Sequence, residues 1–125
     1  MKVFTLAEAN ELLAIVVPKL REIRDYYATV AGFRERATSA AISAELGGGG
    51  MEGGANYVRV LYELGKLTTE INELGVQLKD YTRGLIDFPA MREGRVVLLC
   101  WQHGDGEEIE YWHEVEAGFA GRQPL

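Results

Sequence analysis

Cysteine is almost missing from this chain of 125 residues, in which Cys100 is the only one. No disulfide can therefore form within the chain, and a reducing compartment, the cytoplasm, is the expected location. Basic runs are missing too. The 13 Lys and Arg residues are scattered among 19 Asp and Glu residues, and the net charge is −6. Because an acidic surface repels phosphate backbones, no nucleic-acid partner is expected.

The chain also lacks an apolar run long enough to cross a bilayer. The candidate run Leu12–Val17 follows Glu8 and Glu11 and ends at Pro18. It is too short for a membrane span, and its flanking charges do not suit a signal peptide, so no membrane association is expected. Hydrophobic residues nevertheless make up 47% of the chain. This composition and length predict one globular domain over residues 1–125.

Two segments show the three-and-four spacing of apolar residues that is typical of helices packed through a heptad seam. The first runs from about residue 5 to 31 and opens with a predicted capping box between Thr5 and Glu8. Its seam consists of Leu6, Ala9, Leu13, Val16, Leu20, Ile23, Tyr27 and Val30. The second runs from about residue 56 to 74, with a seam of Tyr57, Val60, Leu64, Leu67, Ile71, Leu74 and Leu78. Alanines at 37–44 indicate a thin helix or a partly mobile extension.

Six glycines in eight residues separate the two helical segments, at Gly47–Gly54. A helix does not tolerate so many glycines because each loses backbone entropy on folding. A phosphate-binding loop would need a preceding strand and a closing Gly-Lys-Ser/Thr, and the sequence has neither. The stretch is predicted to be a flexible connector, which makes residues 5–74 an antiparallel helical hairpin.

After Gly75 the apolar residues alternate, as is typical of strands. Strands are predicted at 76–80, at 85–88 with Pro89 as the stop, at 96–101 and at 109–114. The last two are expected to form a hairpin across Gly104–Gly106. The predicted class is α+β: a coiled-coil-like helical hairpin, then a small antiparallel sheet of three to four strands over 76–114, then a tail at 115–125.

Several stretches of this sequence resemble one protein family. They are "FTLAEANELL" (Phe4–Leu13), "ELGVQLKD" (Glu73–Asp80), "GLIDFPA" (Gly84–Ala90), "LCW" (Leu99–Trp101), "YWHE" (Tyr111–Glu114) and "GFAGRQPL" (Gly118–Leu125). On these residues the chain resembles the bacterial and archaeal domain-of-unknown-function family 2203. The resemblance covers nearly the whole chain. Because the family has no assigned activity, it supports the architecture and implies no mechanism.

Cys100 and His113 can form a nucleophile–base pair only if they share a face of the sheet. If Trp101 lies opposite Ile109, the two side chains point to opposite faces, and a one-residue change of register brings them to one face. The apolar setting of Cys100 also raises the pKa of a thiol. A buried structural cysteine is therefore predicted, with a catalytic cysteine as the alternative.

The candidate polar or ligand site lies where the predicted strands end. Asp80, Asp87 and His113 stand at those ends, and a turn at Gly118–Gly121 folds Arg122 back over them. Arg122 follows six acids between Asp105 and Glu116, and an ion pair that ties down the tail is expected, with a clamp for an anion or carboxylate as the alternative. A pair with Asp87 or Asp80 would also satisfy both charges. The candidate site residues are Asp80, Asp87, His113, Glu114 and Arg122, of which Asp80, Asp87 and His113 are weak candidates for metal ligands. No metal-binding signature, catalytic residue or cofactor motif is evident.

The first helix carries Leu12, Ile15 and Val17 beside its seam. So wide an apolar stripe predicts self-association through the helical hairpins, as a homodimer or a higher even oligomer. The function predicted from the sequence is a self-associating structural or interaction module. The alternative is a small enzyme or a metal- or ligand-binding protein, with its site near Asp80, Asp87, His113 and Arg122.

Overall fold

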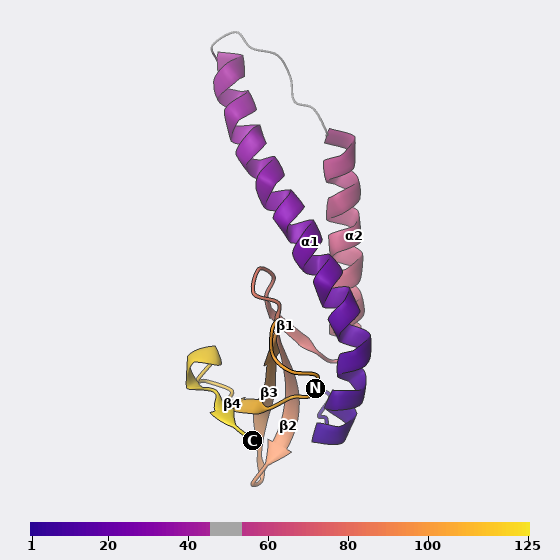
Figure 1. The fold of residues 1–125 in the computed structure, drawn as a ribbon, viewed down its shortest axis with the longest axis vertical. Coiled ribbons are helices and arrows are strands. Elements are labelled where there is room, and N and C mark those ends of the chain that lie inside the picture. The colour runs from indigo at the N-terminus through magenta and orange to yellow at the C-terminus, as the bar shows by residue number, and fades with distance from the viewer. Residues whose placement is uncertain (46–53) are drawn as a thin grey trace.

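A computed structural model describes the backbone of residues 1–45 and 54–125 and the side chains of residues 1–38 and 54–125. Its two helices are α1 (Leu6–Glu45) and α2 (Gly54–Glu73). Its strands are β1 (Gln77–Asp80), β2 (Leu85–Arg92), β3 (Arg95–Gln102), β4 (Tyr111–Glu114) and β5 (Gln123–Pro124), with a 3-10 turn, η1 (Phe119–Gly121), before β5. The predicted connector at 47–54 lies outside the described residues except for Gly54. The α+β class is confirmed (Figure 1).

The helical hairpin forms through the predicted seams. Residues of both helices are buried at the contact, namely Leu13, Val16, Leu20, Ile23 and Val30 of α1 with Val60, Leu67 and Ile71 of α2. The capping box starts α1, because the Thr5 N–H donates to Glu8 Oε1 at 2.9 Å and the Glu8 N–H donates to Thr5 Oγ1 at 3.1 Å. Leu6, assigned to the seam from the sequence, is 41% exposed. The α1 helix also continues well beyond residue 31, through the alanine-rich stretch.

The five strands form one antiparallel meander in the order β1-β2-β3-β4-β5. The prediction of three to four strands missed β5, which has only two residues. β2 and β3 are joined by a two-residue turn at Glu93 and Gly94, whose φ angles are 51° and 78°. Positive φ at both turn residues matches the twist of the flanking strands, so β2 and β3 pair along their whole length.

Pro89 does not end β2, contrary to the prediction, because the strand continues to Arg92. The Pro89 carbonyl accepts a hydrogen bond from the Phe4 N–H at 2.7 Å. In a strand, the N and O atoms of one residue point to the same side. The side on which Pro89 lacks a donor therefore faces the N-terminal segment, and no bond of the ladder with β3 is lost.

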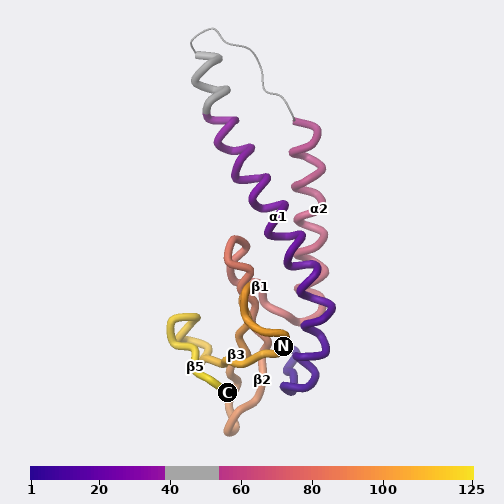
Figure 2. The backbone as a smooth tube through the Cα atoms, viewed as in Figure 1, coloured from indigo at the N-terminus to yellow at the C-terminus, as the bar shows by residue number. Residues whose placement is uncertain are grey.

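The sheet separates two environments. Phe88, Leu99 and Trp112 belong to the core that the sheet shares with the helices. Side chains alternate along a strand, so Asp87, Cys100 and His113 point to the opposite face. The helices lie along the first face and project past the end of the sheet, while the C-terminal segment lies on the side away from them (Figures 1 and 2).

Candidate functional site

Three neighbouring strands bring Asp87, Cys100 and His113 together on the face of the sheet away from the helices. Asp87 of β2 lies opposite Cys100 of β3, and Cys100 lies opposite Tyr111 of β4, two residues before His113. His113 thus shares a face with Cys100 and reaches diagonally across β3 toward Asp87. The three residues are only 2%, 0% and 2% exposed.

The register of β3 and β4 differs by one residue from the one that would place Trp101 opposite Ile109. Cys100 pairs with Tyr111 and Leu99 with Trp112, so Trp101 does not lie opposite Ile109. Ile109 precedes β4, and its N–H donates to Asn10 Oδ1 of α1 at 2.8 Å. This contact with the helix holds Ile109 outside the ladder, and β4 begins at Tyr111. This register places Cys100 and His113 on one face, which is one of the two arrangements that the sequence left open.

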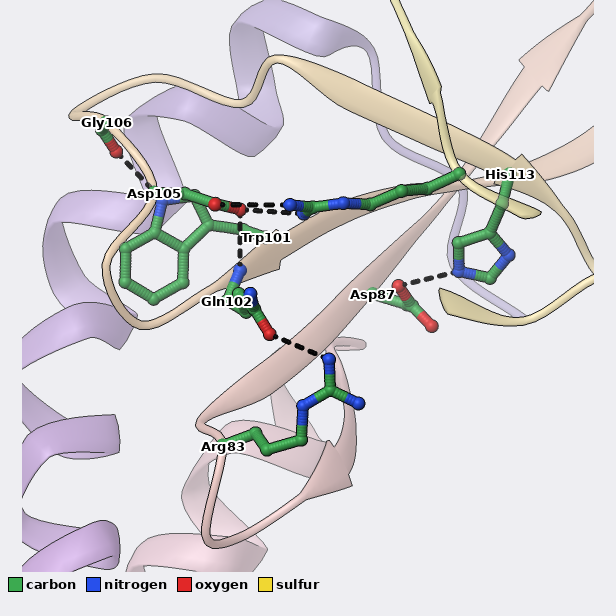
Figure 3. Close-up of polar contacts among 8 residues, drawn as sticks. Arg83, Asp87, Trp101, Gln102, Asp105, Gly106 and His113 are labelled. Atoms are coloured by element: carbon green, nitrogen blue, oxygen red, sulfur yellow. Dashed lines mark hydrogen bonds and ion pairs between the residues drawn. The ribbon is translucent and has the colours of Figure 1, made fainter. Parts of the chain in front are cut away.

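Two hydrogen bonds fix the His113 imidazole. Nδ1 lies 2.7 Å from the Glu114 carbonyl oxygen. Nε2 lies 3.1 Å from Asp87 Oδ1, the contact drawn in Figure 3. A carbonyl oxygen only accepts, so Nδ1 carries a proton and donates it. Nε2 and Oδ1 can both accept a hydrogen bond. One proton must therefore lie between them for this contact to be a hydrogen bond. Every buried side-chain N or O atom in the described part of the chain has a hydrogen-bond partner.

Burial controls the charges at the cluster. It raises the pKa of Asp87 above its ordinary value of 3.8, and the attraction of His113 opposes that rise. Burial likewise raises the pKa of the Cys100 thiol to about 12, and the charge of Asp87 adds to this rise while the nearby Arg122 guanidinium lowers it. Cys100 is therefore a protonated thiol at neutral pH and a poor nucleophile, in agreement with the structural cysteine predicted from the sequence.

Arg122 folds back over this face of the sheet from the C-terminal segment. Its guanidinium lies 4.0 Å from the ring centre of Tyr111 and 4.4 Å from that of Phe119. The expected ion pair that ties down the tail forms, but its partner is neither Asp87 nor Asp80. Arg122 instead pairs with Asp105 of the β3–β4 loop, at 2.9 Å, and that carboxylate also accepts the Gln102 N–H.

Two of the predicted site residues lie outside the cluster. Asp80 accepts the Arg83 N–H at 2.9 Å and so stabilises the turn between β1 and β2. Glu114 forms an ion pair with Arg95, and both side chains are exposed. Sequence reasoning placed Asp87, His113 and Arg122 together, but it left Cys100 and Asp105 out of the site. The missing information was the strand register, because the sequence alone does not decide whether Cys100 and His113 share a face of the sheet.

A separate groove of about 570 Å³ lies between α1 and the β3–β4 loop. Asn10, Pro18 and Arg21 line it from the helix, and Trp101, Asp105 and Glu107 from the sheet side. The indole Nε1–H of Trp101 donates to the Gly106 carbonyl and fixes the loop at this edge (Figure 3). Asp105 is shared by the groove and the Arg122 ion pair, but the Asp87–Cys100–His113 cluster does not line the groove.

The model of one family of uncharacterized conserved proteins, DUF2203, matches residues 2–125. The chain belongs to this family. Comparisons with curated proteins and with solved structures found no match. The membership agrees with the resemblance noted in the sequence. A chemical role for this DUF2203 chain must therefore be argued from its own residues.

In this DUF2203 chain, Asp87, Cys100 and His113 form a group of potential metal ligands: their nearest ligand atoms all lie within 4.8 Å of one another. The group combines a carboxylate, a thiol and an imidazole, all of which bind transition metals.

No helix within the described residues is both long and apolar enough to span a membrane.

Proposed function

We propose that the protein is a self-associating interaction module that dimerises through its helical hairpin. The observation that carries this proposal is an apolar stripe on the outer face of α2, formed by Val58, Leu61 and Tyr62, which are 65%, 40% and 69% exposed. These positions follow the i, i+3, i+4 spacing of one helix face. The opposite face of α2, with Val60 and Leu67, already packs against α1. The proposed setting is the cytoplasm, where a lone thiol stays reduced.

The residues of α1 that suggested association in the sequence contribute less exposed apolar surface than expected. Leu12 and Val17 pack against the core of their own chain, and only Ile15 remains exposed, at 54%. The support for association therefore moves from α1 to α2. The hairpin projects past the sheet (Figure 2). The exposed fractions of the α2 stripe leave it accessible to another molecule.

A second copy of the chain is the proposed occupant of the α2 stripe. If two α2 helices pack antiparallel with the twofold axis between Leu61 and Tyr62, Val58 of each copy meets Gly65 of the other. A Cβ added at Gly65 would touch nothing within 4 Å, so the helices can approach closely there. Two hairpins joined in this way make a four-helix bundle.

Sedimentation velocity at micromolar concentration tests the proposal. The wild-type chain is expected to sediment as a dimer, and the double substitution Leu61→Glu with Tyr62→Glu as a monomer, because four carboxylates would be buried at the axis. Met91→Glu is the matched control, since Met91 is 55% exposed on β2 and is not part of the α2 stripe. Circular dichroism confirms that each variant keeps its helices. A monomeric wild type, or a double variant that still dimerises, would refute the proposal.

A further inference from the structure

We infer that Asp87, Cys100 and His113 form a binding site for a transition metal ion, with Zn²⁺ as the ion that suits the ligand set. The inference concerns the buried face of the sheet and is independent of the proposed association through α2. Its first support is the composition of the cluster. A thiolate, an imidazole and a carboxylate are the three protein ligand types found at zinc sites. The three groups come from β2, β3 and β4, which hold their backbones rigidly side by side.

The orientation of His113 is the second support. Histidines that bind metals with one ring nitrogen almost always donate the other N–H to a carbonyl or carboxylate, which fixes the ring and its tautomer. Here Nδ1 donates to the Glu114 carbonyl oxygen at 2.7 Å. Nε2 is thereby directed toward Asp87, and its lone pair can bind a metal ion that displaces the proton between the two groups. The arrangement is the one that a metal-bound imidazole needs.

Distances between the ligand atoms are compatible with a shared ion. Two ligands bound about 2.0 Å from a tetrahedral zinc lie about 3.3 Å apart. Nε2 of His113 and Oδ1 of Asp87 are 3.1 Å apart, with a shared proton between them. A metal ion would take the place of that proton and of the Cys100 thiol proton. The thiol sulfur lies within 4.8 Å of both other ligand atoms, so a small inward movement completes the contact.

Charge also balances at the proposed site. A thiolate and an ionised Asp87 neutralise a divalent cation, and the neighbouring Arg122 is already paired with Asp105. A buried neutral assembly avoids the cost of an unpaired charge. Three ligand residues form the group within the described part of the chain, so water would take the fourth position. Because the cluster is buried, the ion would enter during folding and would stabilise the folded chain.

Cobalt substitution is the most direct test, because the sequence has one cysteine and two histidines. Tag-free protein is refolded with Co²⁺, and its absorption spectrum is recorded. We expect visible d–d bands and a near-ultraviolet thiolate-to-cobalt charge-transfer band, which only Cys100 can supply. Cys100→Ser should lose the charge-transfer band, and His113→Ala should lose cobalt binding. His103→Ala is the matched control and should bind as the wild type does, since His103 lies outside the cluster and is exposed.

Zinc itself is measured on protein purified from zinc-supplemented cells. We expect about one equivalent of zinc per chain, and a melting temperature that falls when a chelator removes the ion. Wild-type protein that holds no zinc and shows no charge-transfer band would overturn the inference, and so would undiminished binding by folded His113→Ala. If a variant fails to fold, the wild-type cobalt spectrum still decides, because no second thiol exists.

Discussion

At the residue scale, the buried imidazole of His113 has two neighbours with different roles. The Glu114 carbonyl accepts from Nδ1, and this leaves Nε2 in need of a donor when the ring is neutral. Asp87 Oδ1 faces Nε2 at 3.1 Å, so one proton between the two groups serves both. Burial raises the pKa of the Asp87 carboxyl above its ordinary value of 3.8, and the attraction of His113 opposes that rise. The two side chains therefore depend on each other. Removing either one leaves the other buried without its hydrogen-bond partner.

Comparing Asp87→Ala with Asp87→Asn tests the contribution of this hydrogen bond to stability. Asn keeps the shape of the side chain, and Ala does not. In the presence of a chelator, Asp87→Ala should lower the free energy of unfolding by about 2 kcal/mol, because Nε2 is left buried without a partner. Asp87→Asn should cost less, since an amide N–H can donate to Nε2. Urea denaturation measures both variants. Equal losses would contradict the role assigned to the hydrogen bond.

At the element scale, the two helices are joined by an ion pair as well as by their apolar seams. Lys19 Nζ of α1 lies 2.8 Å from Glu70 Oε2 of α2, and both side chains are partly exposed. The hydrogen bond from Lys19 lowers the pKa of Glu70 below its ordinary value of 4.5. A carboxyl whose pKa is lowered on folding stabilises the folded state above its unfolded pKa, and this contribution is lost as the pH falls through the folded pKa.

Glu70→Gln should therefore reduce stability at neutral pH and make no difference in acid well below the ordinary pKa of 4.5. The effect at neutral pH should be small, because a partly exposed pair is screened by solvent. Glu73→Gln is the control, since Glu73 is an exposed acid of α2 and has no ion pair within the described residues. Denaturation curves at neutral and acidic pH make the comparison. If the difference in stability between the wild type and Glu70→Gln persists in acid, it does not come from the ion pair of Lys19 with Glu70.

At the scale of the whole molecule, the sheet is buried on both faces by different parts of the chain. The helices cover Phe88 and its neighbours, and the C-terminal segment brings Arg122 over Tyr111. The N-terminal segment is tied to the same sheet, because Phe4 packs edge-on against Phe88 with ring centres 5.6 Å apart. The core thus joins the first and the middle parts of the sequence.

Phe88→Ala should accordingly destabilise the whole fold. Phe88 is fully buried, and deleting such a ring costs about 3–5 kcal/mol through lost burial and the cavity left behind. This is a large share of the roughly 5–15 kcal/mol that stabilises an ordinary domain. Thermal unfolding followed by circular dichroism should show a large drop in melting temperature. Met91→Ala, at an exposed position of the same strand, should leave it nearly unchanged, and similar losses in both variants would contradict the position of the core.

Local patterns of the sequence predicted the helical hairpin and most strands because those elements depend on neighbouring residues. Apolar spacing identified the seams of α1 and α2, and Thr5 with Glu8 marked the start of α1. The same local reasoning failed at Pro89. Whether a proline ends a strand depends on which side of the ladder its missing N–H faces, and here that side meets Phe4, which is far away in the sequence.

The candidate site depended on a tertiary contact. Side chains alternate strictly along β3 and β4, so a change of register by one residue decides whether Cys100 and His113 lie on opposite faces or on one. The apolar run of β3 does not choose between these registers. The bond from Ile109 to Asn10 of α1 selects the second. Likewise, the turn before Arg122 was predictable, but its choice of Asp105 over Asp87 follows from where the β3–β4 loop lies. The sequence by itself determined the elements and the chemical groups available, and long-range contacts decided which of those groups meet.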